Sequence, residues 1–194
     1  MPPQQFFGRG RQTRAGAGGT FRKGAKIGVK CRTPGAKEAW RAARLREVLP
    51  VPYAHWVFTL PHALNPLAMR HARLLYGALF DSAAATLLEL AANPRWLGAV
   101  PGFSLVLHTW SQDLRMHLHV HALITCGGLD AEGRWRTPAR GPHFLFPVQA
   151  ASKVFRGTFL ARLDAAHRSG ELPDDPQGAP GAWQDRRRAL LVHD

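Results

Sequence analysis

The stretch that most constrains the fold is "MHLHVHALITCGGL", residues 116 to 129, in which polar and apolar residues alternate. The polar positions are three histidines, His117, His119 and His121. The positions between and after them are apolar, Leu118, Val120 and Ala122. Successive side chains of a β-strand point to opposite faces of a sheet. The pattern therefore predicts a strand with three imidazoles on one face and a buried apolar set on the other.

Other parts of the sequence predict the strands and helices that surround this strand. We expect helices at 37–47, 66–92 and 149–171, and strands at 53–61, 102–110, 116–129 and 134–138. The helix at 66–92 is either continuous or broken near Gly77, and Asn65 and Pro66 are typical of its N-cap and first turn. Residues 143–148 fit an edge strand or a loop. The order predicts an α+β fold, an antiparallel sheet with the histidine strand central and helices packed on one face.

Positive charge is concentrated at the amino-terminal end of the chain. The formal net charge is +13, and nine lysines and arginines precede Glu38 without one acidic residue. From position 38 onward, 17 basic residues face all 13 acidic ones, which leaves +4. This balance favours a polyanionic partner, most simply nucleic acid. We expect a disordered basic leader at 1–36, a folded domain at 37–172 and an irregular basic tail at 173–194.

Cysteine content and hydropathy bear on the cellular compartment. The two cysteines, Cys31 and Cys126, do not provide a disulfide framework. No apolar run reaches the roughly 20 residues that a membrane span needs. The basic amino-terminal segment is not followed by the apolar stretch of a secretory signal. We therefore expect a cytoplasmic protein with no membrane partner.

The three histidines of the central strand are candidate metal ligands. Neighbouring histidines at this spacing have Cα atoms roughly 6–7 Å apart, so their side chains can converge on one divalent cation. A cation with open coordination positions can polarise a phosphate oxygen. The alternative is a solvated strand face without a ligand, which three imidazoles within five residues make less favourable.

Five short motifs together resemble a known family. In chain order they are "VFTLP", "LHTW", "HLHVH", "GGL" and "FRGTFL", within a similarity that runs from about residue 31 to 172. With this order and spacing, the segment resembles the two-tyrosine, HUH-type transposases of rolling-circle insertion sequences. The string "HLHVHAL" alone also resembles the histidine-triad nucleotide hydrolases, which remain an alternative.

The transposase resemblance implies a metal-dependent reaction on single-stranded DNA. In that family a histidine pair holds a divalent cation, here Mg²⁺ or Mn²⁺, beside the scissile phosphodiester, and a tyrosine attacks to form a 5′-phosphotyrosine link before strand transfer. The matching pair is His119 and His121. His117 would be a third ligand or a phosphate contact. His108 and Gln112, on weaker matching positions, would be further ligands or orienting partners.

The chain departs from that family in its tyrosines and cysteines. Its tyrosines, Tyr53 and Tyr76, match no family nucleophile and are interpreted as packing residues. Cys31 alone cannot form the four-ligand zinc module with which the family usually begins. We therefore expect an incomplete catalytic domain, truncated before its tyrosines, that binds metal and single-stranded DNA without nicking alone. Whether the chain is an enzyme stays open, and a non-catalytic nucleic-acid-binding remnant is the other reading.

Basic and aromatic side chains are candidates for contacts with DNA. The basic candidates are Arg115, Arg134, Arg136, Arg140, Lys153 and Arg156. Trp110 and Trp135 are candidates for stacking on bases. The alternatives are that these arginines are ordinary surface residues and that the tryptophans belong to the core.

Overall fold

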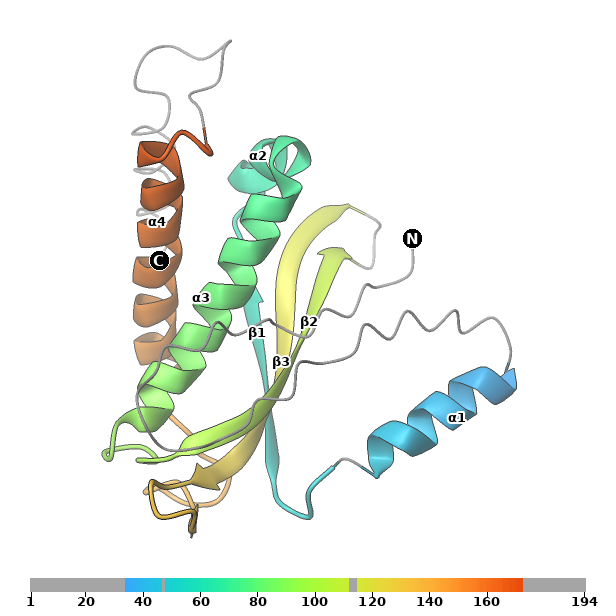
Figure 1. Cartoon of the computed structure of the whole chain (residues 1–194), viewed down its shortest axis with the longest axis vertical. Helices are drawn as coiled ribbons and strands as arrows, with labels where there is room; N and C mark the ends of the chain where they lie inside the picture. Colours follow the sequence, from blue (N-terminus) through green and yellow to red (C-terminus); the bar gives the residue numbers. More distant parts are fainter. Residues whose placement is uncertain (1–33, 47, 112–114, 173–194) are drawn as a thin grey trace.

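The computed structural model describes residues 34–46, 48–111 and 115–172 (Figure 1). Its elements are α1 (Pro34–Leu45), β1 (Tyr53–Thr59), the 3₁₀ helix η1 (His62–Leu64), α2 (Asn65–Arg70), α3 (Ala72–Ala92), β2 (Val100–Trp110), β3 (Met116–Leu129), β4 (Trp135–Arg136) and α4 (Val148–Arg168). The predicted basic tail lies outside the described residues. So does the predicted leader, except for 34–36, where α1 begins earlier than expected.

The sheet is antiparallel and β3 is its central strand, as predicted. The strand order is β1-β3-β2, and the short β4 pairs with the end of β3. In this register His121 lies opposite Val57 on β1 and opposite Val106 on β2. Because β3 is hydrogen-bonded on both sides, the direction of every side chain along it is fixed by two neighbours.

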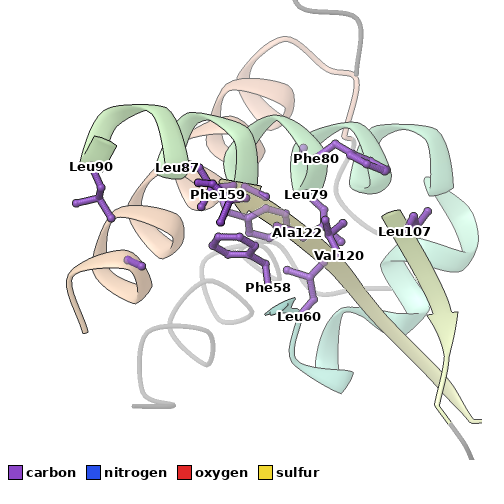
Figure 2. Packing of buried hydrophobic residues seen from close by; sticks show 14 of the residues in the cluster. Phe58, Leu60, Leu79, Phe80, Leu87, Leu90, Leu107, Val120, Ala122 and Phe159 are labelled. Carbon is purple, nitrogen blue, oxygen red and sulfur yellow. The ribbon is translucent and has the colours of Figure 1, made fainter. Parts of the chain in front are cut away.

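One face of the sheet is covered by α3 and α4 (Figure 1). The apolar side chains of β3 point into this layer and are fully buried: Leu118, Val120, Ala122 and Ile124. Figure 2 shows Val120 and Ala122 beside Leu79 and Leu87 of α3 and Phe159 of α4. Burial of each such large aliphatic side chain stabilises the fold by about 1.5–3 kcal/mol. The predicted α+β fold with helices on one face is therefore confirmed.

The opposite face of the sheet, which we call the histidine face, carries the alternate residues of the three long strands. They are His55, Val57 and Thr59 on β1, His117, His119, His121 and Leu123 on β3, and Ser104, Val106 and His108 on β2. Side chains there are more accessible than those under the helices, since Val57 is 44% exposed and Leu123 is 46% exposed. The period-two pattern of the sequence thus separates a core face from an accessible face.

The helical segment after β1 differs from the prediction in where it breaks. The break is at His71, whose φ of −121° and ψ of 45° are not helical, whereas Gly77 lies inside α3. The change of direction lets Leu67 of α2 and Leu75 of α3 both enter the core. Asn65 is the first residue of α2 rather than its N-cap, because its side-chain amide donates to the Met116 carbonyl at 2.8 Å.

Helix α3 corrects one expectation about hydropathy. It is 21 residues long and, by length and composition, apolar enough to cross a membrane, so the expectation that no run approaches that length was wrong here. Ten of its residues are buried against the sheet and α4. A helix that is apolar on most sides is also what the core of a folded domain requires, and α3 occupies that position.

The "GGL" motif marks a place where the backbone leaves no room for side chains. A Cβ atom at Gly127 would overlap the Trp135 ring, and one at Gly128 would overlap the Val100 carbonyl group. Thr125, which is buried, donates to the Gly127 carbonyl at 2.6 Å and accepts the Gly102 amide at 3.0 Å. These contacts close the end of β3 against β2 and β4. Residues 143–147 form a loop before α4, which is one of the two alternatives expected for 143–148, and residue 148 is already the first residue of α4.

Candidate metal centre

Three imidazoles from two strands converge on the histidine face. One ring nitrogen from each of His108, His119 and His121 lies within 4.8 Å of the others. The ring centroids of His108 are 5.2 Å from His119 and 4.3 Å from His121, and those of His119 and His121 are 5.0 Å apart. We call these residues the three-histidine cluster. Nitrogen atoms this close can bind one cation after small rotamer changes.

The pairing of β2 with β3 explains why His108 joins the cluster. His108 lies directly opposite His119, and directly opposed residues of an antiparallel pair project from the same face. The register is continuous from Phe103 to His108, and it changes next between His108 and Trp110. His119 and His121 are two residues apart on β3 and therefore share that face. The strand pairing alone thus places the three side chains together.

A backbone hydrogen bond orients His119. Its Nδ1 atom lies 2.8 Å from the His117 carbonyl oxygen. A carbonyl only accepts hydrogen bonds, so Nδ1 carries the proton and Nε2 keeps its lone pair. A histidine whose outer nitrogen donates to a carbonyl has its other nitrogen directed and available for a metal.

The surroundings of His108 and His121 favour the neutral imidazole. Burial lowers the pKa of His108 below its ordinary value, and the neighbouring His119 lowers it further. Burial also lowers the pKa of His121, with smaller contributions from His108, His119 and His55. The neutral imidazole is the form that can bind a cation, and burial together with the neighbouring imidazoles favours this form for His108 and His121.

His117, another predicted member of the site, is not part of the three-histidine cluster. His117 lies on the histidine face, with its ring 4.9 Å from His119 and 5.0 Å from His62 of η1. Gln112 lies outside the described residues. His117 instead lines a cavity of about 390 Å³ with His62, Ser111 and Arg115. We call this cavity the basic cleft, and it adjoins the cluster through His117.

Two histidines of the site were not found from the sequence. His62 faces His117 in the basic cleft. His55 contacts His121, with its Nε2 atom 2.7 Å from His121 Nδ1. His55, Val57 and Thr59 are alternate residues of β1 and therefore share one face, but only the pairing of β1 with β3 shows that this is the histidine face.

The predicted DNA contacts lie in several parts of the molecule. Arg134 and Arg136 form ion pairs with Asp130 at 3.2 and 2.9 Å, within the turn that joins β3 to β4. Hydrogen bonds, first that from the Arg134 amide, lower the pKa of Asp130 to about 2. The guanidinium groups of Arg134 and Arg136 therefore stabilise the turn.

The remaining candidates are also spread over both faces. Lys153 and Arg156 are on α4, which covers the core face of the sheet. The Arg140 guanidinium lies 5.1 Å from the centre of the Trp96 ring. Trp110, at the end of β2, is 54% exposed, and Trp135 packs over Gly127. Of the predicted cations in the described residues, Arg115 is the one that lines the basic cleft.

Comparison with known proteins shows similarity to transposases. A family model described as "Putative transposase" matches residues 102–191, which include most of β2 and all of β3 and α4. The chain is 43% identical over 138 residues to "Putative transposase y4qJ" of Sinorhizobium fredii (strain NBRC 101917 / NGR234), covering 71% of this chain and 34% of that protein. It is 40% identical over 101 residues to "Transposase for insertion sequence element IS801" of Pseudomonas savastanoi pv. phaseolicola, covering 52% of this chain and 24% of that protein. The chain therefore spans about a third or less of these relatives.

Solved structures show a looser likeness. A conjugative relaxase, TrwC, in a metal-bound complex with OriT DNA aligns with a TM-score of 0.45 and 15% identity, over 71% of this chain and 62% of that chain. A likeness of this degree is too loose to support a conclusion about the site.

Proposed function

We propose that this chain, which carries a segment of an HUH-type transposase of rolling-circle insertion sequences, binds a divalent metal ion and single-stranded DNA on its histidine face. The three-histidine cluster would hold the metal, and the neighbouring basic cleft would hold the DNA backbone. The observation that carries the proposal is the convergence of three imidazole nitrogens within 4.8 Å, on the side of the sheet opposite α3 and α4.

The donor set fits a transition-metal ion better than a hard cation. Three neutral imidazoles suit Mn²⁺, Co²⁺, Ni²⁺, Cu²⁺ or Zn²⁺, whereas Mg²⁺ prefers oxygen ligands in a near-ideal octahedron. Of Mg²⁺ and Mn²⁺, the two ions expected from the sequence, we therefore propose Mn²⁺. Three protein ligands also leave coordination positions open, which is the arrangement of catalytic rather than structural sites.

The chemistry at this centre divides between the ion and the protein. When bound, a divalent ion supplies Lewis-acid polarisation of a phosphodiester oxygen. The protein supplies orientation, because the His117 carbonyl holds His119 with Nε2 available. The basic cleft supplies cationic and hydrogen-bonding groups, Arg115 among them, that suit a phosphate next to the metal-bound one.

We further propose that the chain as given forms no covalent link to DNA through its own tyrosines. The Tyr53 hydroxyl accepts a hydrogen bond from the Leu49 amide at 2.9 Å, at the beginning of β1. Tyr76 is on α3 and packs against the core on the other side of the sheet. Neither contact directs a hydroxyl toward the three-histidine cluster. A phosphotyrosine link would then need a nucleophile that this sequence does not supply.

Calorimetric titration of the metal-stripped chain with Mn²⁺, Zn²⁺ and Mg²⁺ tests the metal centre. The double variant His119→Ala/His121→Ala should lose one bound ion per chain, and His143→Ala, at an exposed position, should retain it. Binding of a labelled single strand should survive in the double variant at low salt, because the backbone contacts are separate. An unchanged metal affinity in the double variant would refute the proposed centre.

Covalent chemistry is tested separately with the same labelled strand and Mn²⁺. We expect no protein–DNA adduct that survives denaturing electrophoresis, and an adduct would overturn the proposal about the tyrosines. Metal-free turnover of an adenosine phosphoramidate would instead favour the nucleotide hydrolase reading.

A further inference from the structure

We propose that His55 is a positioning residue that fixes the tautomer and orientation of His121 at the metal centre. The inference rests on the proposed function and adds a residue to it. The His55 Nε2 atom lies 2.7 Å from His121 Nδ1, and the two ring planes are within 8° of parallel with centroids 4.9 Å apart. A short contact between near-coplanar rings is the geometry of a ring-to-ring hydrogen bond.

The backbone brings this pair together without help from a loop. His55 lies opposite Leu123 and Val57 lies opposite His121, so His55 is the diagonal neighbour of His121 across the β1–β3 pair. Diagonal neighbours on one face are within reach of long side chains. On the other face of β1, the rings of Trp56 and Phe58 lie 4.9 Å from those of Phe146 and Phe155. These aromatic contacts hold β1, and therefore His55, against the core.

The hydrogen bond has two directions, and only one is compatible with metal binding. If His121 donates from Nδ1 to His55, its Nε2 atom keeps a lone pair that points away from His55 and can bind the ion. If His55 donates instead, the proton of neutral His121 is on Nε2 and the lone pair of Nδ1 is used by His55. His121 is then no ligand. We infer that His55 accepts through Nε2 and that its own proton is on Nδ1.

His119 and His121 thus obtain the same tautomer in two ways. For His119 the acceptor is the main-chain carbonyl of His117, which no substitution removes. For His121 the acceptor is the side chain of His55, which a substitution removes without changing any of the three proposed ligands. Loss of such an outer partner typically weakens metal affinity roughly 10–100-fold.

Two substitutions separate positioning from mere packing. His55→Leu keeps bulk on the strand and removes the acceptor. His55→Gln restores an amide oxygen at a reach similar to that of Nε2. In calorimetric titrations of the full chain with Mn²⁺ and Zn²⁺, His55→Leu should bind roughly 10–100-fold more weakly, and His55→Gln should recover most of the loss. His143→Leu, the removal of an exposed imidazole elsewhere, should bind as the unmodified chain does. Equal affinities for His55→Leu and His143→Leu would overturn the inference.

A readout on the metal-free protein distinguishes failure of this inference from failure of the proposed function. Long-range ¹H–¹⁵N NMR of histidine-labelled chain at pH ~8, above the ordinary histidine pKa, reports which ring nitrogen carries the proton. His121 should carry it on Nδ1 in the unmodified chain and in His55→Gln, and should lose this preference in His55→Leu. A proton on His121 Nε2 in the unmodified chain would refute the inference even if the metal binds.

The same spectra test whether His55 is a ligand instead. If His55 only positions His121, its nitrogens should shift little on Zn²⁺ addition, while Nε2 of His119 and His121 shift strongly. A large shift at a His55 nitrogen would make His55 a direct ligand and overturn the positioning role. If no metal binds at all, the proposed function fails, while the tautomer of His121 still decides the role of His55.

Discussion

Replacing Leu118 by Ala should separate the stability of the fold from the metal centre that the same strand carries. Leu118 is fully buried under the helices, at 0% exposure, between two residues of the histidine face. Removing three carbons loses roughly 2.4 kcal/mol at about 0.8 kcal/mol per buried carbon. The cavity left by incomplete collapse raises the expected loss to about 2.7–5 kcal/mol.

The matched change on the other face is His119→Ala. This side chain is partly buried and makes one hydrogen bond to a carbonyl, so its loss should cost only about 1 kcal/mol. Urea unfolding with a chelator present measures both stabilities, and calorimetry at 15 °C measures metal affinity of the folded fraction. We expect Leu118→Ala to be unstable but metal-competent and His119→Ala to be stable but impaired in metal binding. A Leu118→Ala variant that loses less than about 1 kcal/mol would refute the assignment of that face to the core.

Three further predictions concern the strand ends, the turn and the cleft. Gly128→Ala should destabilise the fold by about 1–3 kcal/mol in urea unfolding, because the added carbon meets the immobile Val100 backbone; an unchanged midpoint would contradict this close approach. Asp130, with its pKa held at about 2, should stabilise the fold at pH values above its ordinary pKa of 3.8 and lose this contribution as the pH falls toward 2. The difference in melting temperature between the unmodified chain and Asp130→Asn should therefore shrink as the pH falls from 3.8 to 2. A difference that stays constant over this interval would refute the prediction. Arg115→Ala should weaken single-strand binding and reduce the salt slope by about 0.7, whereas Arg156→Ala, on the helix side, should leave both unchanged; fluorescence anisotropy at several salt concentrations distinguishes these results.

The central strand was predictable because its signal is local. Alternation of histidines with Leu118, Val120 and Ala122 defines two faces without reference to any other segment, and β3 has the predicted bounds. The resemblance to transposases of insertion sequences is likewise confirmed, because several short motifs in fixed order rarely coincide.

Which histidines form the three-histidine cluster was harder to predict from the sequence. His117 was grouped with His119 and His121 because it is near them along the chain. The structure brings His108, which the resemblance offered only as a weaker candidate, next to them through the β2–β3 register, and it brings His55 through β1. Register depends on pairings between segments far apart in the sequence, so spacing within one strand cannot reveal it. Binding of metal by any of these histidines stays a prediction.

The break between α2 and α3 also depends on contacts that the local sequence does not reveal. Local propensity pointed to Gly77, but the chain bends at His71, where the turn lets α2 and α3 both reach the core. Asn65 was expected to cap a helix and instead donates to Met116 on β3. In both cases a tertiary contact outweighs a local preference of a fraction of a kcal/mol to about 1 kcal/mol.

Because its imidazoles come from paired strands, the proposed metal binding by the three-histidine cluster would depend on how β2 and β3 are aligned. A slip of β2 by one residue along β3 would turn Leu107 outward and push His108 among the leucines under α3. Uptake of one metal ion by refolded protein would thus indicate that β2 and β3 are correctly paired. Measurement of metal uptake could therefore be used to check the folding of recombinant protein before any nucleic acid is added.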